Sequence, residues 1–172
     1  MAAMLAADAL TAELAAHGLH FVIGTEPAPV TPRLTPAELL AALAQQRDAR
    51  LRAALIALLL DQPALADAAP AALALLDGTA QQMLMLYYTA AVILQGKYAA
   101  RLQPLVPEWR ILPDRYAAAL DLPAEPNPDA RLAQLGQRQR EITGLAANWV
   151  GTYENTAQRF LRRREKEAQW AA

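Results

Sequence analysis

The stretch TAQQMLMLYYTAAVILQGKYAARLQ, residues 79–103, decides the fold that this sequence predicts. Its apolar side chains recur at helical steps, and between Met83 and Leu94 almost every position is apolar. Apolar side chains therefore cover most of the circumference of the helix. Because such a helix is normally surrounded by others, we expect 79–103 to form the centre of an all-α bundle.

Helix starts and stops mark the elements around this centre. The segment TPAE at 35–38 combines a threonine cap, a proline at the first helical position and a glutamate that can reach back to the cap. The segment NPD at 127–129 repeats the cap-then-proline start. Gly18 and Gly144 follow apolar periodic stretches and are typical helix ends. These signals predict helices from about 4–16, from 35 onward, and over 130–143.

The remaining segments complete a compact bundle of five to seven helices. Residues 35–62 form a helix whose polar middle, 45–48, is either exposed or divides it in two. Prolines make 63–76 two short turns and 105–112 an irregular connector, with Trp109 and Ile111 plugging the edge of the core. We expect a short helix over 113–120 and a last helix over 147–169. The LHFVI segment at 19–23 is either one short strand or extended chain.

The sequence predicts one domain, in which the N-terminal residues form a part distinct from the rest. Residues 1–34 are expected to form a helix and an extended proline-rich arm, and residues 35–172 the helical domain. The apolar stretches 51–60 and 83–94 fall short of the roughly 20 residues that span a membrane, so no membrane association is expected. Because cysteine is absent, nothing indicates an oxidising compartment, and we expect a cytoplasmic protein.

The residue types exclude several classes of enzyme. The chain has no cysteine and no serine, which removes every catalytic mechanism that uses a Ser or Cys nucleophile. Its seven glycines are isolated, so no P-loop is present. Two histidines, His17 and His20, supply at most half of a metal site, and we predict no metal and no cofactor. Chemistry by carboxylate, tyrosine or arginine side chains stays open, and would need a pocket that gathers residues such as Tyr98, Arg101, Asp114 and Arg115.

The leading functional expectation is a non-catalytic interaction module: a subunit, regulator or adaptor that contacts another protein or its own copy. Hydrophobic residues make up 55% of the chain and charged residues only 19%, which leaves little polar surface for a monomer, although 41 residues are alanine. Arg47, Arg50 and Arg52 in the polar middle of 35–62 are candidate contact residues. Tyr88 is a fourth candidate, because adjacent tyrosines on one helix cannot both face the core in the same direction.

The alternative expectation is a nucleic-acid-associated helical protein, such as a regulator or an antitoxin-like partner. A formal net charge of −1 gives no general attraction to a polyanion, so any contact with phosphate must come from a local patch. Arg159, Arg162, Arg163 and Lys166 form the densest basic cluster, near the end of the last predicted helix. A helix C-terminus also stabilises cations, and Arg163 can pair with Glu167 four residues later.

Overall fold

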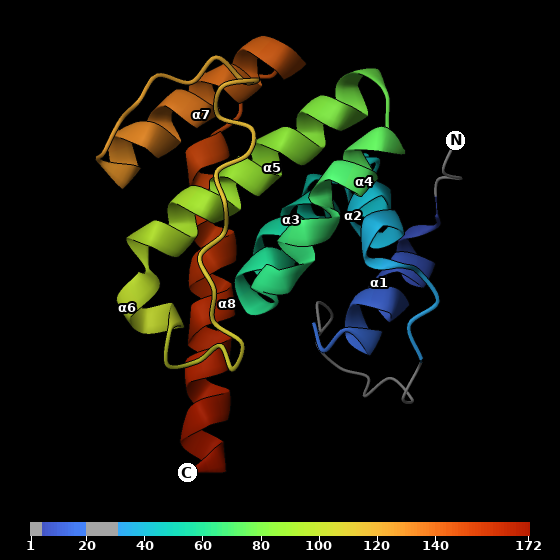
Figure 1. The fold of residues 1–172 in the computed structure, drawn as a ribbon, viewed down its shortest axis with the longest axis vertical. Helices are drawn as coiled ribbons and strands as arrows, with labels where there is room; N and C mark the ends of the chain where they lie inside the picture. The colour runs from blue at the N-terminus through green and yellow to red at the C-terminus, as the bar shows by residue number, and fades with distance from the viewer. Residues whose placement is uncertain (1–4, 20–30) are drawn as a thin grey trace.

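A computed structural model describes residues 5–19 and 31–172 of this chain, and it confirms the all-α class. Within these ranges there are eight α-helices, one short 3₁₀ helix and no strand (Figure 1). The helices are α1 (Ala7–Ala16), α2 (Pro36–Ala44), α3 (Ala49–Asp61), α4 (Ala69–Ala74), α5 (Gly78–Lys97), α6 (Ala99–Leu102), α7 (Pro128–Thr143) and α8 (Trp149–Ala171). The 3₁₀ helix Pro63–Ala68 precedes α4. The segment 19–23, expected to be either a short strand or extended chain, lies, apart from Leu19, outside the described residues.

The capping residues and the glycine stop predicted from the sequence are found at the ends of α2 and α7. At the start of α2, Thr35 Oγ1 accepts a hydrogen bond from the Glu38 amide at 3.3 Å, and the Glu38 carboxylate accepts one from the Thr35 amide at 2.8 Å. Asn127 caps α7 through its side-chain oxygen, which accepts from two amides. Gly144 ends α7 in the left-handed region, at φ 69°.

Helix α5 is the centre of the fold, as the opening stretch predicts. It packs against α2, α3, α7 and α8, which lie around it in Figure 1. Tyr87 and Tyr88 are both completely buried, so the prediction that Tyr88 forms an outward contact is wrong. The reason is that α5 is covered on opposite sides: Tyr87 meets the Tyr153 ring on α8, and Tyr88 meets the Tyr116 ring. Two adjacent residues that point in different directions therefore both reach the core.

The expected helix over 113–120 is absent, and only turns occur over 116–121. Residues 103–127 instead form a long connector that runs across α5 (Figure 1). The Gln95 side chain on α5 donates to the Arg110 carbonyl at 2.8 Å and accepts from the Leu112 amide at 2.7 Å. The Tyr88 hydroxyl donates to the Pro113 carbonyl at 2.8 Å. Side chains of α5 thus satisfy three backbone groups of this connector.

Two further details differ from the sequence prediction. Leu112 and Val106 fill the edge of the core, whereas Ile111 is 79% exposed and does not plug it. The continuous helix over 79–103 is interrupted at Tyr98, the residue between α5 and α6. The polar middle of 35–62 does divide that helix, because Asp48 caps the new helix α3 by accepting from the Arg50 amide at 2.8 Å.

Helix α1 packs into the same core as the rest of the chain. Leu10 and Leu14 are fully buried in the main hydrophobic cluster. The buried Glu13 carboxylate accepts hydrogen bonds from the amides of Arg33, at 2.8 and 3.1 Å, and Leu34, at 3.3 Å. Residues 31–34 are therefore held to α1 by charge-assisted hydrogen bonds.

Within residues 5–19 and 31–172, no single helix is both long and apolar enough to cross a membrane. Helix α3 and the segment 63–74 meet the length and composition criteria only as a pair, and the two parts are bent by 117°.

Candidate functional site

The first predicted contact surface, at the start of α3, is only partly available. Arg47 and Arg50 are exposed. Arg52 instead folds back on the turn between α2 and α3, where its guanidinium donates to the carbonyls of Gln46, at 2.6 Å, and Arg47, at 3.2 Å. These carbonyls follow the end of α2 and would otherwise lack partners. Arg52 therefore has a structural role at the turn.

The second predicted surface lies on α8, and the core-facing side of this helix fixes its position. Tyr153 is buried, and its hydroxyl donates to the side-chain oxygen of Gln139 on α7. The Gln139 amide in turn donates to the Tyr87 hydroxyl at 3.4 Å. Burial raises the pKa of Tyr153, so its hydroxyl stays protonated and remains a donor. This chain of hydrogen bonds joins α8 to α7 and α5.

A polar cluster holds the adjoining side of α8 against α5, α6 and the start of α7. Lys97 makes ion pairs with Asp129, at 2.5 Å, and with Glu154. The Tyr98 hydroxyl donates to the Glu154 carboxylate at 2.5 Å. Burial alone would lower the pKa of Lys97, but hydrogen bonds to Asp129 and Glu154 outweigh it and raise that pKa. Every charged member has a partner, which is typical of a structural cluster.

Further ion pairs and hydrogen bonds hold the C-terminal half of α8 against α3, α6 and the residue Leu105. Arg101 on α6 donates two hydrogen bonds to the Glu165 carboxylate, at 2.9 and 3.1 Å. Arg164 pairs with Asp61 at 3.3 Å and with Glu167 at 3.1 Å, and donates to the Leu105 carbonyl at 3.1 Å. Hydrogen bonds from Arg101 lower the pKa of Glu165. The two acidic residues in this part of α8 are thus held by arginines.

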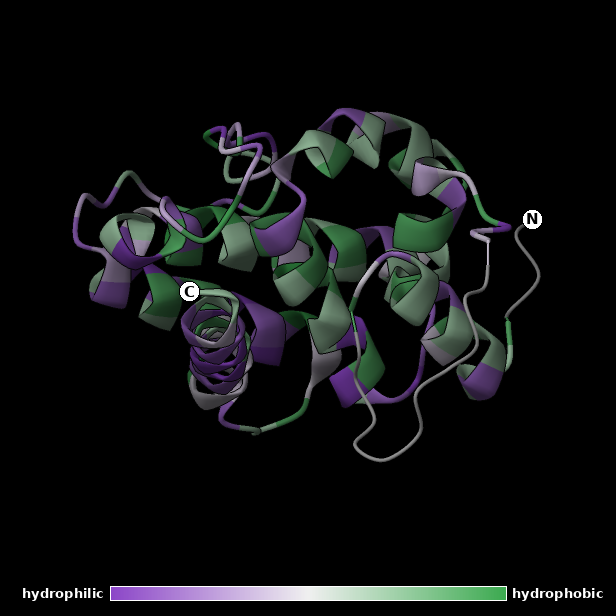
Figure 2. Ribbon diagram, turned by 90° about the horizontal axis from the view of Figure 1, so that it is seen from below, coloured by the Kyte–Doolittle hydropathy of each residue, from purple (hydrophilic) through white to green (hydrophobic). Residues whose placement is uncertain are grey.

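The opposite side of α8 carries the four predicted cations and one aromatic ring. Arg159, Arg162, Arg163 and Lys166, together with Trp170, fall within an arc of about 100° on the helix. We call this set the α8 basic face. It turns away from the core-facing residues Tyr153, Ala157 and Leu161, which are buried. In Figure 2, where α8 is seen nearly end-on, this helix is largely hydrophilic and lies at the edge of the molecule.

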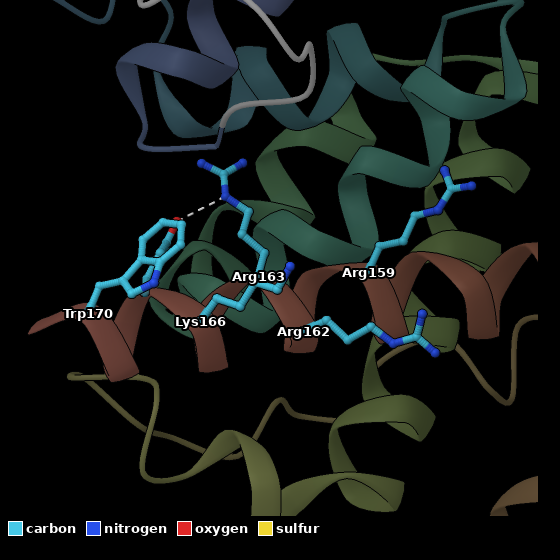
Figure 3. A pocket seen from close by; sticks show the side chains of 6 residues that line it. Arg159, Arg162, Arg163, Lys166 and Trp170 are labelled. Atoms are coloured by element: carbon cyan, nitrogen blue, oxygen red, sulfur yellow. Dashed lines mark hydrogen bonds and ion pairs between the residues drawn. The ribbon is translucent and has the colours of Figure 1, made fainter. Parts of the chain in front are cut away.

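The α8 basic face borders a shallow groove that is open to solvent, and Glu167 also lines it (Figure 3). Arg159 and Arg163 point to one side of α8, Arg162 points to the other, and Trp170 stands one turn beyond Lys166. The Trp170 side chain is among the most exposed, at 82%. The C-terminal end of α8 extends past the other helices (Figure 1).

The cations of this face differ in how they are paired. Arg163 donates to Glu167 at 2.9 Å, as the spacing of four residues predicts. Arg159, Arg162 and Lys166 form no hydrogen bond or ion pair through their side chains within the described parts of the chain. Their positive charge is therefore available to an external anion.

The residues named for possible enzyme chemistry do not converge on one pocket. Tyr98 and Arg101 contact each other and α8. Asp114 pairs with Arg131, whereas Arg115 approaches Asp67 at 3.9 Å. Across the residues that the structure describes, no group of three or more His, Asp or Glu side chains is placed to hold a metal ion.

Trp170 is the member of the α8 basic face that the sequence prediction missed. Its signal is the spacing of four residues from Lys166 and seven from Arg163, which places all three on one helix face. An aromatic residue beside a basic cluster is otherwise easily assigned to the core. Comparison with known protein families, with curated proteins and with solved structures gave no match for this chain.

Proposed function

We propose that this protein is a non-catalytic interaction module that binds another protein through the α8 basic face. The observation that carries the proposal is the solvent-facing arrangement of four cations and an exposed indole on one rigidly held helix. Tryptophan and arginine are the residues most enriched among those that dominate the binding energy of protein interfaces. The functional class is that of a subunit, regulator or adaptor.

Other surfaces of the described chain offer less to a partner. Apart from Trp170, the large exposed hydrophobic residues are Leu75, Ile111 and Leu145, which stand singly on different segments. Single exposed apolar residues are normal on soluble proteins. Many of the apolar residues counted in the composition lie in the hydrophobic core around α5.

The experiment is affinity purification of the tagged protein from its own host at native level, with three versions of the chain. The unmodified chain is expected to bring down a partner. Arg162→Glu with Lys166→Glu is expected to lose that partner. Arg47→Glu with Arg50→Glu makes the same charge change at the other exposed surface that the sequence predicted, and this variant is expected to keep the partner. A monomer without any co-purifying protein, or loss of the partner in the Arg47/Arg50 variant, contradicts the proposal.

Binding to nucleic acid is a second candidate, favoured by the three cations of α8 that have no partner in the described chain. Its signature is affinity that falls steeply with salt, with a slope of about 0.7 to 0.9 per neutralised phosphate. Labelled single- and double-stranded oligonucleotides in a salt titration test it directly. Binding that Arg162→Glu abolishes would make this the better assignment.

A further inference from the structure

We infer that the partner of the α8 basic face is an acidic protein segment that carries several carboxylates in a row and an apolar recess for Trp170. This inference rests on the proposed function and specifies the chemistry of the partner. Three properties of the face support it: the position of its own acidic neighbours, its length, and the charge of the surrounding chain.

Two acidic residues, Glu165 and Glu167, lie beside the face. Arginines engage both of them, so they do not neutralise all of its positive charge. Glu165 is held on the flank by two hydrogen bonds from Arg101. Burial alone would raise the pKa of Glu167, but hydrogen bonds from Arg163 and Arg164 lower it, so the carboxylate is ionised and engaged. In the described residues, the side chains of Arg159, Arg162 and Lys166 form no hydrogen bond or ion pair with a carboxylate, although Arg162 is close enough to Glu165 to help lower its pKa. Charge complementarity therefore calls for an anionic partner.

The face has the length and spacing of a short peptide contact. From Arg159 to Trp170 it spans about 16 Å at the rise of an α-helix. Apart from the adjacent Arg162 and Arg163, the steps between its members are three or four residues, the same steps at which carboxylates on a facing helix would recur. Because the Arg162 and Arg163 side chains point in different directions in Figure 3, a segment that lies along α8 can meet more than one guanidinium group.

Trp170 adds an apolar anchor at one end of this stripe. Its ring is 82% exposed, so an apolar recess on a partner can remove a large aromatic surface from water. Such an anchor fixes the register of the contact, whereas the charges mainly speed association and set its salt dependence.

The charge of the rest of the chain favours a protein segment over a nucleic acid. Without the four cations of the face, 12 basic side chains remain against 17 acidic ones. Outside the face the chain therefore carries a net charge of −5, so a polynucleotide that continues beyond the 16 Å stripe gains no general attraction from the rest of the chain. An acidic peptide ends where the stripe ends. A second copy of this same face is disfavoured, because like charges would oppose each other.

The test measures binding of defined probes to the full chain by fluorescence anisotropy. The first probe is a labelled helical peptide with glutamates at i, i+3, i+4 and i+7 and a leucine at i+11, which repeats the spacing of the α8 face. The second has glutamine in place of each glutamate. The third is a single-stranded oligothymidine of similar length. Each is titrated against the unmodified chain, R162E/K166E, W170A and the charge-matched control R47E/R50E.

The acidic peptide is expected to bind the unmodified chain and R47E/R50E alike, and to lose at least about ten-fold in affinity with R162E/K166E. W170A is expected to weaken binding several-fold while the salt dependence stays the same. Tighter binding of the oligothymidine than of the acidic peptide overturns the inference in favour of a nucleic acid, and equal binding of the glutamine peptide overturns its electrostatic part. Self-association that R162E/K166E abolishes points to a second copy and also overturns it.

Failure of this inference is distinguishable from failure of the proposed function. If no acidic probe binds but a protein from the host still co-purifies through Arg162 and Lys166, the acidic segment is wrong and the interaction module stands. If neither the probes nor any host protein depends on the α8 basic face, both are wrong.

Discussion

At the scale of single residues, buried polar groups act mainly as connectors between helices. Gln139 on α7 is completely buried and lies between the hydroxyls of Tyr153 and Tyr87. Because a buried hydroxyl without a partner is costly, this amide both orients the two rings and fixes α8, the helix that presents the basic face.

Replacing Gln139 with alanine is expected to destabilise the protein by about 2 to 4 kcal/mol. The change leaves two tyrosine hydroxyls unpaired and opens a cavity in the core. Urea unfolding followed by circular dichroism measures the loss. Gln137→Ala on the exposed side of the same helix is the control and is expected to change stability by less than about 0.5 kcal/mol. Equal effects of the two substitutions would contradict a structural role for Gln139.

Asp61, near the end of α3, gives a pH-dependent prediction. Burial raises the pKa of its carboxyl, and the ion pair with Arg164 offsets this only in part. The ionised carboxylate is therefore less stable in the folded chain than in the unfolded one, so its contribution to stability improves as pH falls through that pKa. At each pH, the stability of Asp61→Asn is compared with that of the unmodified protein. The difference is expected to favour the variant more at pH 7 than at about pH 3.5. Unfolding in urea at both pH values tests the sign, and the opposite trend would mean that the Arg164 pair outweighs burial.

At the scale of secondary-structure elements, side chains from neighbouring helices decide where regular structure stops. The connector 103–127 is held across α5 by Gln95, whose amide group serves two backbone partners. The Pro113 carbonyl, at the start of the helix expected over 113–120, is held in the same way by the Tyr88 hydroxyl. Contacts from a distant segment therefore replace the local helix.

Gln95→Ala is expected to release this connector and to cost about 2 to 3 kcal/mol, because a buried amide and a carbonyl lose their partner. Hydrogen exchange is expected to rise most at Leu112, with little change in α7. The control is Gln103→Ala at an exposed position of the chain. Unchanged protection of the Leu112 amide would rule out Gln95 as the residue that holds the connector.

Two glycines form a matched pair of element-scale predictions. Gly144 ends α7 at φ 69°, where an alanine side chain is strained, so Gly144→Ala is expected to cost about 1 kcal/mol. Gly96 lies inside α5 with nothing within 4 Å of an added Cβ, so Gly96→Ala is expected to stabilise by about 0.5 to 1 kcal/mol. Thermal unfolding compares the two, and effects of the same sign would be inconsistent with their backbone conformations.

At the scale of the whole molecule, the core extends from α1 to α8. Leu14 on α1 is fully buried in the cluster that also contains residues of α5 and α8. We therefore expect Leu14→Ala to lower the stability of the entire chain by about 2 to 4 kcal/mol, in a single cooperative transition. Calorimetry tests this. A separate early transition, or an unchanged main transition, would show that residues 1–34 are an independent arm.

Sequence patterns predicted much of this architecture because their causes are local. The TPAE cap, the NPD cap and the glycine stop at 144 involve residues within one helical turn, so their outcome depends little on the rest of the chain. The basic cluster on α8 was likewise readable from spacing, since residues three or four apart share a helix face. Trp170 belonged to that face by the same rule but was not assigned to it.

The all-α class, the central helix and the grouping of the α8 cations were thus determined by the sequence itself, because periodicity and caps act over a few residues. Only the tertiary structure decided that Tyr88 is buried, that Arg52 closes a turn, that 113–120 is not helical and that Arg159, Arg162 and Lys166 form no ion pair within the described chain. Each of these outcomes depends on a residue far away in sequence. Which groups a side chain meets across the core is a property of packing, and no local pattern encodes it.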